Sequence, residues 1–85
     1  MTGDRMLVGH VFGDGAEIVA AVWPDYGDPV ALVHWPRDLE LDVLRFHPWC
    51  ACRVGVDRDG EPVRYSSTFT STRQEAEQVI GGMFA

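Results

Sequence analysis

Hydrophobic and polar positions alternate along much of this chain, and the alternation predicts a fold rich in β-strands. Residues 6–12 and 17–23 carry many β-branched and aromatic side chains. They flank the stretch GDGA, whose Asp-Gly pair favours a two-residue turn. We therefore expect a hairpin in which Val11 lies opposite Ile18. Both of its faces are largely apolar, so we expect it to be covered on both sides.

The next two segments differ in clarity. Residues 30–35 (VALVHW) follow a turn cluster at 24–29 and predict a strand that stops at Pro36. Residues 38–46 (DLELDVLRF) fit two patterns, because their apolar positions alternate as in a strand but also match helical spacing behind Asp38, a good N-cap. We favour a strand or an irregular edge segment here.

A second hairpin is predicted by residues 50–56 and 62–69, which flank the pair Asp59-Gly60. A two-residue turn at that pair fixes the register of the two strands. The facing pairs are then Val56 and Val63, Val54 and Tyr65, Cys52 and Ser67, and Cys50 and Phe69. We expect this face to be core, and the more polar face that carries Ala51 to lie in water.

Beyond Phe69 the hydrophobic period changes from two residues to about 3.6. Apolar residues recur at Ala76, Val79, Ile80 and Met83. Ser71 precedes them, with Gln74 three residues on, as in a capping box. The pattern predicts a C-terminal amphipathic helix whose last turn frays near Gly81 and Gly82, since glycine is a poor helix former.

These elements predict one small α+β domain over residues 1–85. Its sheet is antiparallel, has four to six strands built from two hairpins and a connecting strand, and packs against the C-terminal helix. Several strands are apolar on both faces, so we expect the sheet to be strongly curved or to be completed by a second copy in a dimer.

Composition narrows the classes of partner. The formal charge is −6, and the chain has no run of basic residues, which argues against binding to nucleic acid. Its apolar runs are too short to span a membrane, and we expect a cytoplasmic protein. Every basic residue is arginine, and lysine and asparagine are absent, a bias typical of a GC-rich genome such as that of an actinobacterium or its phage.

The stretch FHPWCAC, residues 46–52, holds both cysteines and raises the question of a metal or redox site. Cys50 and Cys52 point to the same side of the predicted strand, toward the expected core, where free cysteine packs as a small hydrophobe. We therefore expect no metal site and no cofactor. The alternative is a zinc-stabilised module that uses His47, Cys50 and Cys52, with His34 or His10 as fourth ligand.

The histidines and serines form no recognised catalytic spacing, so we assign no catalytic residue and favour a non-enzymatic protein. Aromatic side chains remain as candidates for binding, because exposed aromatic residues mark interfaces and ligand pockets. The candidate binding residues are Trp23, Trp35, Trp49, Tyr26 and His34.

We therefore expect a binding or regulatory module that engages a protein partner, or a second copy of itself, through an aromatic patch. The acidic run Asp38, Glu40 and Asp42 would provide its rim. The alternative from a different class is a small-molecule-binding or minor enzymatic domain, barrel-like, with a pocket lined by tryptophan and histidine.

Overall fold

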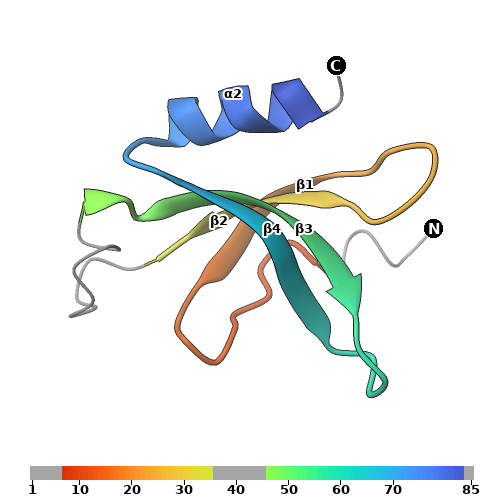
Figure 1. Cartoon of the computed structure of the whole chain (residues 1–85). Helices are drawn as coiled ribbons and strands as arrows, with labels where there is room; N and C mark the ends of the chain where they lie inside the picture. The colour runs from red at the N-terminus through yellow and green to blue at the C-terminus, as the bar shows by residue number, and fades with distance from the viewer. Residues whose placement is uncertain (1–6, 36–45, 84–85) are drawn as a thin grey trace.

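The computed structural model describes residues 7–35 and 46–83, and it shows a four-stranded antiparallel sheet with one helix packed against it (Figure 1). The strands lie side by side in the order in which they occur along the chain. The elements are β1 (Glu17–Val22), β2 (Val30–His34), β3 (Trp49–Val56), β4 (Pro62–Thr70) and α2 (Arg73–Met83). The predicted α+β layout is confirmed. The described sheet is open, with β1 and β4 at its edges.

The strand predicted at 30–35 is confirmed as β2. The segment 38–46, which fitted two patterns, falls almost entirely outside the described residues. Only Phe46 of that segment is described, and its side chain is exposed.

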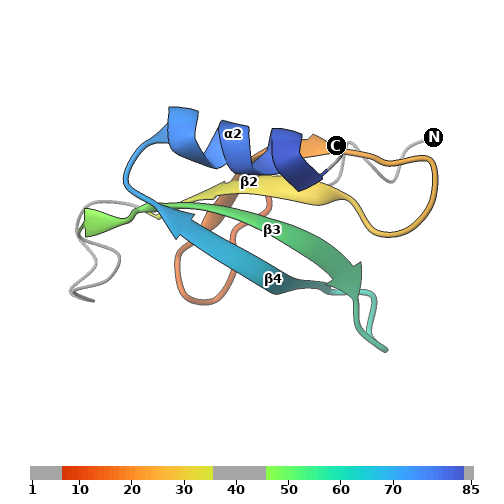
Figure 2. The same cartoon turned by 45° about the horizontal axis from the view of Figure 1, so that its top comes forward.

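Two layers cover the sheet, one on each side (Figure 1, Figure 2). α2 lies over β2, β3 and β4 on one side, and the segment from Leu7 to Ala16 lies on the other. We call these the helix face and the N-terminal face. Buried side chains of the helix face are Val30, Leu32, Ala51, Ala76 and Ile80. Buried side chains of the N-terminal face are Leu7, Ala16, Ile18, Ala31, Val33, Trp35, Cys50, Cys52 and Val54.

β3 is enclosed on both faces in the middle of the molecule. Cys50, Ala51 and Cys52 are consecutive and fully buried, although alternate residues of a strand point to opposite sides. Ala51 lies under α2, so the expectation that this side of the hairpin faces water is wrong at Ala51, whereas Thr68 on β4 is exposed. The small side chain of Ala51 lets the helix approach the sheet. The polar residues on the same face of the predicted hairpin, such as Arg53, gave no sign of this contact. The expectation that the other side of the hairpin is core is wrong outside Cys50, Cys52 and Val54, since Val56, Val63 and Phe69 are exposed.

Both Asp-Gly loops contain three residues instead of two. Phe12 N–H donates to the carbonyl oxygen of Ala16 (2.8 Å), and Asp57 N–H donates to that of Glu61 (3.0 Å). A two-residue turn of the predicted kind needs a positive φ at the aspartate as well as at the glycine. Only the glycines, Gly15 (φ 91°) and Gly60 (φ 83°), adopt it. The extra loop residue shifts each register by one position.

The first predicted hairpin is accordingly wrong in extent as well as in register. Residues 6–12 do not form a strand where the structure describes them, and pairing is reduced to an isolated bridge between Val11 and Glu17. Val11 therefore does not lie opposite Ile18. Leu7 to Gly9 form a turn, since His10 N–H donates to the Leu7 carbonyl oxygen and Gly9 has a φ of 93°. β1 pairs with β2 instead.

In the second hairpin the predicted register holds at one end only. Cys50 lies opposite Phe69 as predicted, but Val54 lies opposite Arg64 and not opposite Tyr65. An irregularity in the ladder, at which Ser66 has a φ of 53°, compensates for the extra loop residue. As a result Arg64 lies on the N-terminal face, and Tyr65 lies on the helix face.

The C-terminal helix is confirmed, with a different cap. Thr72 is the N-cap: Glu75 N–H donates to its Oγ1 (3.2 Å), and its hydroxyl donates to Glu75 Oε1 (3.1 Å). The predicted cap, Ser71, lies one residue too early. α2 also continues through both glycines to Met83.

Replacing Thr72 with alanine should lower the free energy of unfolding by about 1 kcal/mol, because the first turn of α2 loses its side-chain acceptor. Urea denaturation followed by circular dichroism measures this change. Ser71→Ala is the matched control and should cost much less, since the Ser71 hydroxyl contacts only the exposed ring of His47. Equal losses in the two variants would contradict the assigned cap.

Candidate functional site

The five predicted binding residues do not form one patch. Trp35 is only 2% exposed and belongs to the core of the N-terminal face. His34 and Trp49 lie side by side on the helix face, with ring centroids 4.3 Å apart. Trp23 (46% exposed) and Tyr26 (93% exposed) belong to the β1–β2 loop, at the opposite end of β2. Only these last two are strongly exposed.

The thiols of Cys50 and Cys52 lie in the core of the N-terminal face, as predicted, and both are free. Cys50 has the predicted neighbour Phe69, whereas Tyr65 belongs to the other face. The hydrogen bond shared with Cys50, together with burial, raises the pKa of Cys52. The same hydrogen bond lowers the pKa of Cys50 to about 7. The packing role of the two cysteines is therefore inferred from their complete burial in the core and not from their pKa values.

The residues of the zinc alternative are not brought together. His34 lies beside Trp49 on the helix face, whereas Cys50 and Cys52 lie on the N-terminal face. The ring of His47 is exposed, with Nδ1 at 2.9 Å from Ser71 Oγ. Among residues 7–35 and 46–83, no three His, Cys, Asp or Glu side chains are grouped as metal ligands.

Burial predicts that neither thiol reacts readily in the folded protein. Ellman's reagent should modify the native chain only as fast as it opens, and both thiols should react at once in concentrated urea. The absorbance of the released thiolate measures both rates. A thiol that reacts within the mixing time without denaturant would contradict the buried placement.

On the N-terminal face, Arg64 joins the N-terminal segment to β4. Its guanidinium lies 4.3 Å from the ring centroid of Phe12 and 5.1 Å from that of Trp35, and Nη2 is 2.6 Å from Asp14 Oδ2. Burial would raise the pKa of Asp14. The hydrogen bonds from Arg64 and from Ala16 N–H, with the charge of Arg64, outweigh burial and hold this pKa below its ordinary value. We call this group the Arg64 clamp.

The Arg64 clamp gives stability a defined dependence on pH. A lowered pKa in the folded state means that the unfolded chain binds more protons in acid, so the contribution of Asp14 is present above pH 3.8 and is lost as the pH falls through the folded value. Asp14→Asn keeps an acceptor for Ala16 N–H but removes the charge.

The free energy of unfolding of wild type should exceed that of Asp14→Asn at neutral pH by less than about 1 kcal/mol, because solvent screens this partly exposed pair. The difference should shrink below pH 3.8. Urea titrations at a series of pH values measure it. A difference that grows in acid would contradict the ion pair.

At the other end of β2, Asp28 fastens the β1–β2 loop to the sheet. The Tyr65 hydroxyl donates to Asp28 Oδ2 (2.5 Å), and Arg53 Nη1 donates to the Asp28 carbonyl oxygen (3.1 Å). The hydrogen bond to Asp28 raises the pKa of Tyr65, since it needs the protonated phenol. These bonds hold the loop that carries Trp23 and Tyr26.

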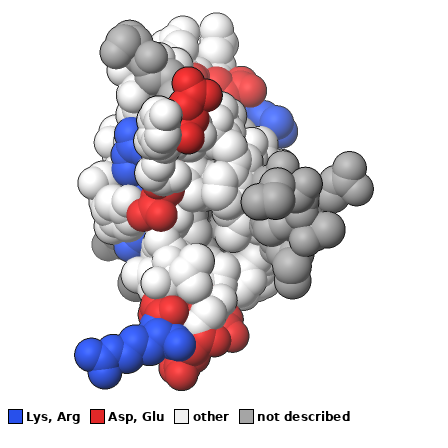
Figure 3. Space-filling model, turned by 90° about the vertical axis from the view of Figure 1, so that its right-hand side faces the viewer, with Lys and Arg blue, Asp and Glu red and all other residues white. Residues whose placement is uncertain are grey.

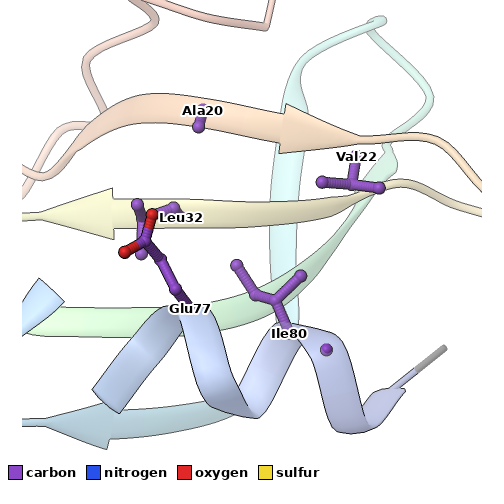
Figure 4. Close-up of a pocket in the computed structure, with 6 residues that line it drawn as sticks. Ala20, Val22, Leu32, Glu77 and Ile80 are labelled. Atoms are coloured by element: carbon purple, nitrogen blue, oxygen red, sulfur yellow. The ribbon is translucent and has the colours of Figure 1, made fainter. Parts of the chain in front are cut away.

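The helix face is hollowed where α2 meets β1. α2 packs over β2, β3 and β4, and a groove with a volume of about 430 Å³ lies between the helix and β1 (Figure 4). Its lining residues are Ala20, Val22, Leu32, Glu77, Ile80 and Gly81. Figure 4 shows Ile80 and Glu77 reaching from α2 toward the sheet, where Leu32 also lines the groove. Such a lining can hold apolar side chains and one cation.

Sequence reasoning did not find this groove, because it depends on where α2 comes to rest across the sheet. The available signal was the small side chain of Ala20 beside Ala21, which indicates room for a close approach at β1. Here that room is left partly open. Val22, at the end of β1, remains 44% exposed.

The β1–β2 loop and the β3–β4 loop carry mainly negative charge. Figure 3 shows the end of the molecule where these loops lie, with a cluster of charged side chains at the bottom, over the β3–β4 loop. The described residues of the two loops supply five carboxylates and one arginine: Asp25, Asp28, Asp57, Asp59, Glu61 and Arg58. Uncharged surface lies above the cluster.

Comparison with protein-family models, with curated proteins and with solved structures finds no match to this chain. None of the helices described for it is long and apolar enough to cross a membrane.

Proposed function

We propose that this chain is a non-enzymatic binding or regulatory module that engages a protein partner through the groove between β1, β2 and α2. The supporting observation is the groove itself, which is lined by apolar side chains and a single carboxylate, that of Glu77. Apolar hollows on the surface of a small protein commonly mark sites of protein interaction. In this proposal α2 is amphipathic. Its buried residues Ala76 and Ile80 face the sheet, and its polar residues face the solvent.

Exposed aromatic side chains lie in the loop that follows β1. Trp23 directly follows Val22 in sequence, and Tyr26 lies in the same loop. In this proposal the partner also contacts these two residues. Large aromatic side chains contribute much of the binding energy in protein interfaces. The aromatic patch predicted from the sequence is thus reduced to these two residues in the proposal. The acidic rim predicted at 38–42 lies outside the described residues.

We propose that the module acts in the cytoplasm, and its two free cysteines support a reducing compartment. A second copy of the chain is the other candidate partner, favoured by the edge position of β1 in the described sheet. The formal charge of −6 on each copy opposes self-association. Sedimentation of the chain alone, over a range of concentrations, separates the two cases.

The test compares wild type with Val22→Glu, which puts a charge at the groove. Val56→Glu is the matched control, because Val56 is 69% exposed and belongs to β3 on the N-terminal face, opposite the groove. Each chain is used for affinity capture from cells that produce it, with quantitative mass spectrometry, and each captured protein is then purified and titrated.

We expect a protein that binds wild type and Val56→Glu alike and binds Val22→Glu at least about tenfold more weakly, since the glutamate must lose its water on binding. Circular dichroism checks that both variants fold. If no captured protein distinguishes the two variants, the groove is not the binding surface.

A further inference from the structure

The open edge of β1 specifies the conformation of the partner. We propose that the groove receives an extended segment that joins β1 as an additional strand, places apolar side chains in the groove, and carries arginine or lysine toward Glu17 and Glu77. This inference rests on the proposed function and deepens it, because it states the backbone form and the charge of the bound segment.

Backbone groups at the outer edge of β1 provide the first argument. Ile18 turns its N–H and C=O outward, where they bond to His10 and Gly9 (3.0 and 2.7 Å). Ile18 lies opposite Val33 of β2, and Ala21 lies opposite Ala31. Ala31 and Val33 are two residues apart on β2, so their backbone groups point the same way, toward β3. The N–H and C=O of Ala21 therefore point outward, as those of Ile18 do. No described residue bonds to this part of the edge.

The two edges of the sheet differ in how they are protected. β4 begins with Pro62, carries Arg64 and has the irregularity at Ser66, all of which hinder pairing with another strand. The half of β1 from Val19 to Val22 has no proline and no charge. An added strand is therefore accepted more readily at β1, where main-chain hydrogen bonds supply affinity.

The groove continues from this edge on the helix face. Ala20 and Val22 line it and point to that face, since their ladder partners Leu32 and Val30 belong to the helix-face core. Alternate side chains of a strand placed beside β1 would stand next to them. The small side chain of Ala20 leaves space there for a larger apolar one.

The charges near the groove favour a basic segment, and not a second copy of this acidic chain, as the occupant. Glu17 shares the helix face with Glu77, because it lies opposite His34, which stacks on Trp49 of that face. The nearest described cation to Glu77 is Arg73, whose Nε is 3.7 Å away in an exposed pair. The groove carboxylate of Glu77, with Glu17 at the other end of β1 on the same face, complements a segment that bears arginine or lysine.

The experiment selects binders from a library of short random peptides displayed on phage and titrates them against variants of the full chain. Ala21→Pro removes the outward N–H, and Ala21→Ser keeps it as the matched control. Glu77→Gln removes the groove carboxylate, and Glu61→Gln in the β3–β4 loop is its control. Val22→Glu reports on the groove itself.

We expect selected peptides with alternating apolar residues and flanking arginine or lysine. Ala21→Pro should weaken their binding roughly tenfold, through a lost hydrogen bond and a steric block. Glu77→Gln should weaken it about two- to fivefold. Both controls should bind as wild type does. Bound peptide should also slow hydrogen exchange at the Ala21 amide about tenfold or more, which decides the question if Ala21→Pro does not fold.

The outcomes separate the two proposals. Peptides that lose binding to Val22→Glu but bind Ala21→Pro normally and leave Ala21 exchange unchanged would overturn strand addition and leave the groove as a binding site. Peptides that bind equally after their basic residues are replaced by glutamate would overturn the charge requirement. If no selected peptide depends on Val22, both proposals are wrong.

Discussion

The enclosure of β3 on both faces is the constraint on which the rest of the structure depends. A strand whose consecutive residues Cys50, Ala51 and Cys52 are all removed from water needs a layer above it and another below. α2 supplies one layer, and the segment from Leu7 to Ala16 supplies the other. A chain of 85 residues has little material for two layers, so neither spans the full width of the sheet.

The incomplete cover explains where a binding surface arises. α2 is centred over β3 and leaves the helix face of β1 only partly covered, which produces the groove. On the opposite side of the sheet, Phe12, Trp35 and Arg64 close the layer with ring and charge contacts. The two thiols are buried beneath that layer. The surface open to a partner and the sulfur-containing core thus belong to opposite faces of one sheet.

Sequence patterns predicted the strands at 30–35 and 50–56, the second hairpin and the C-terminal helix, because each has a local signal. The predictions failed where the sequence fits two local structures whose positions differ by one residue. An Asp-Gly pair suits a two-residue turn, but that turn needs a positive φ at aspartate. The chain instead takes a three-residue loop in which only the glycine has a positive φ, which glycine adopts without strain. In the same way Ser71 and Thr72 are both good caps, and only the position of the helix chooses between them.

The candidate site was less accessible to prediction than the fold. Tryptophan content indicated an aromatic patch, yet the structure divides these residues among the core, one end of β2 and the β1–β2 loop at its other end. Exposure of a particular ring depends on contacts between distant segments, such as Trp35 with Phe69, and no local pattern encodes it. The groove likewise arises from the relative positions of α2 and β1.

The Arg64 clamp also has a consequence for the order of events during synthesis. Asp14 and Arg64 are 50 residues apart in sequence, so the N-terminal layer cannot be fastened until β4 has left the ribosome. Until then Phe12 lacks its contact with the Arg64 guanidinium. The N-terminal layer is therefore completed only at a late stage of synthesis.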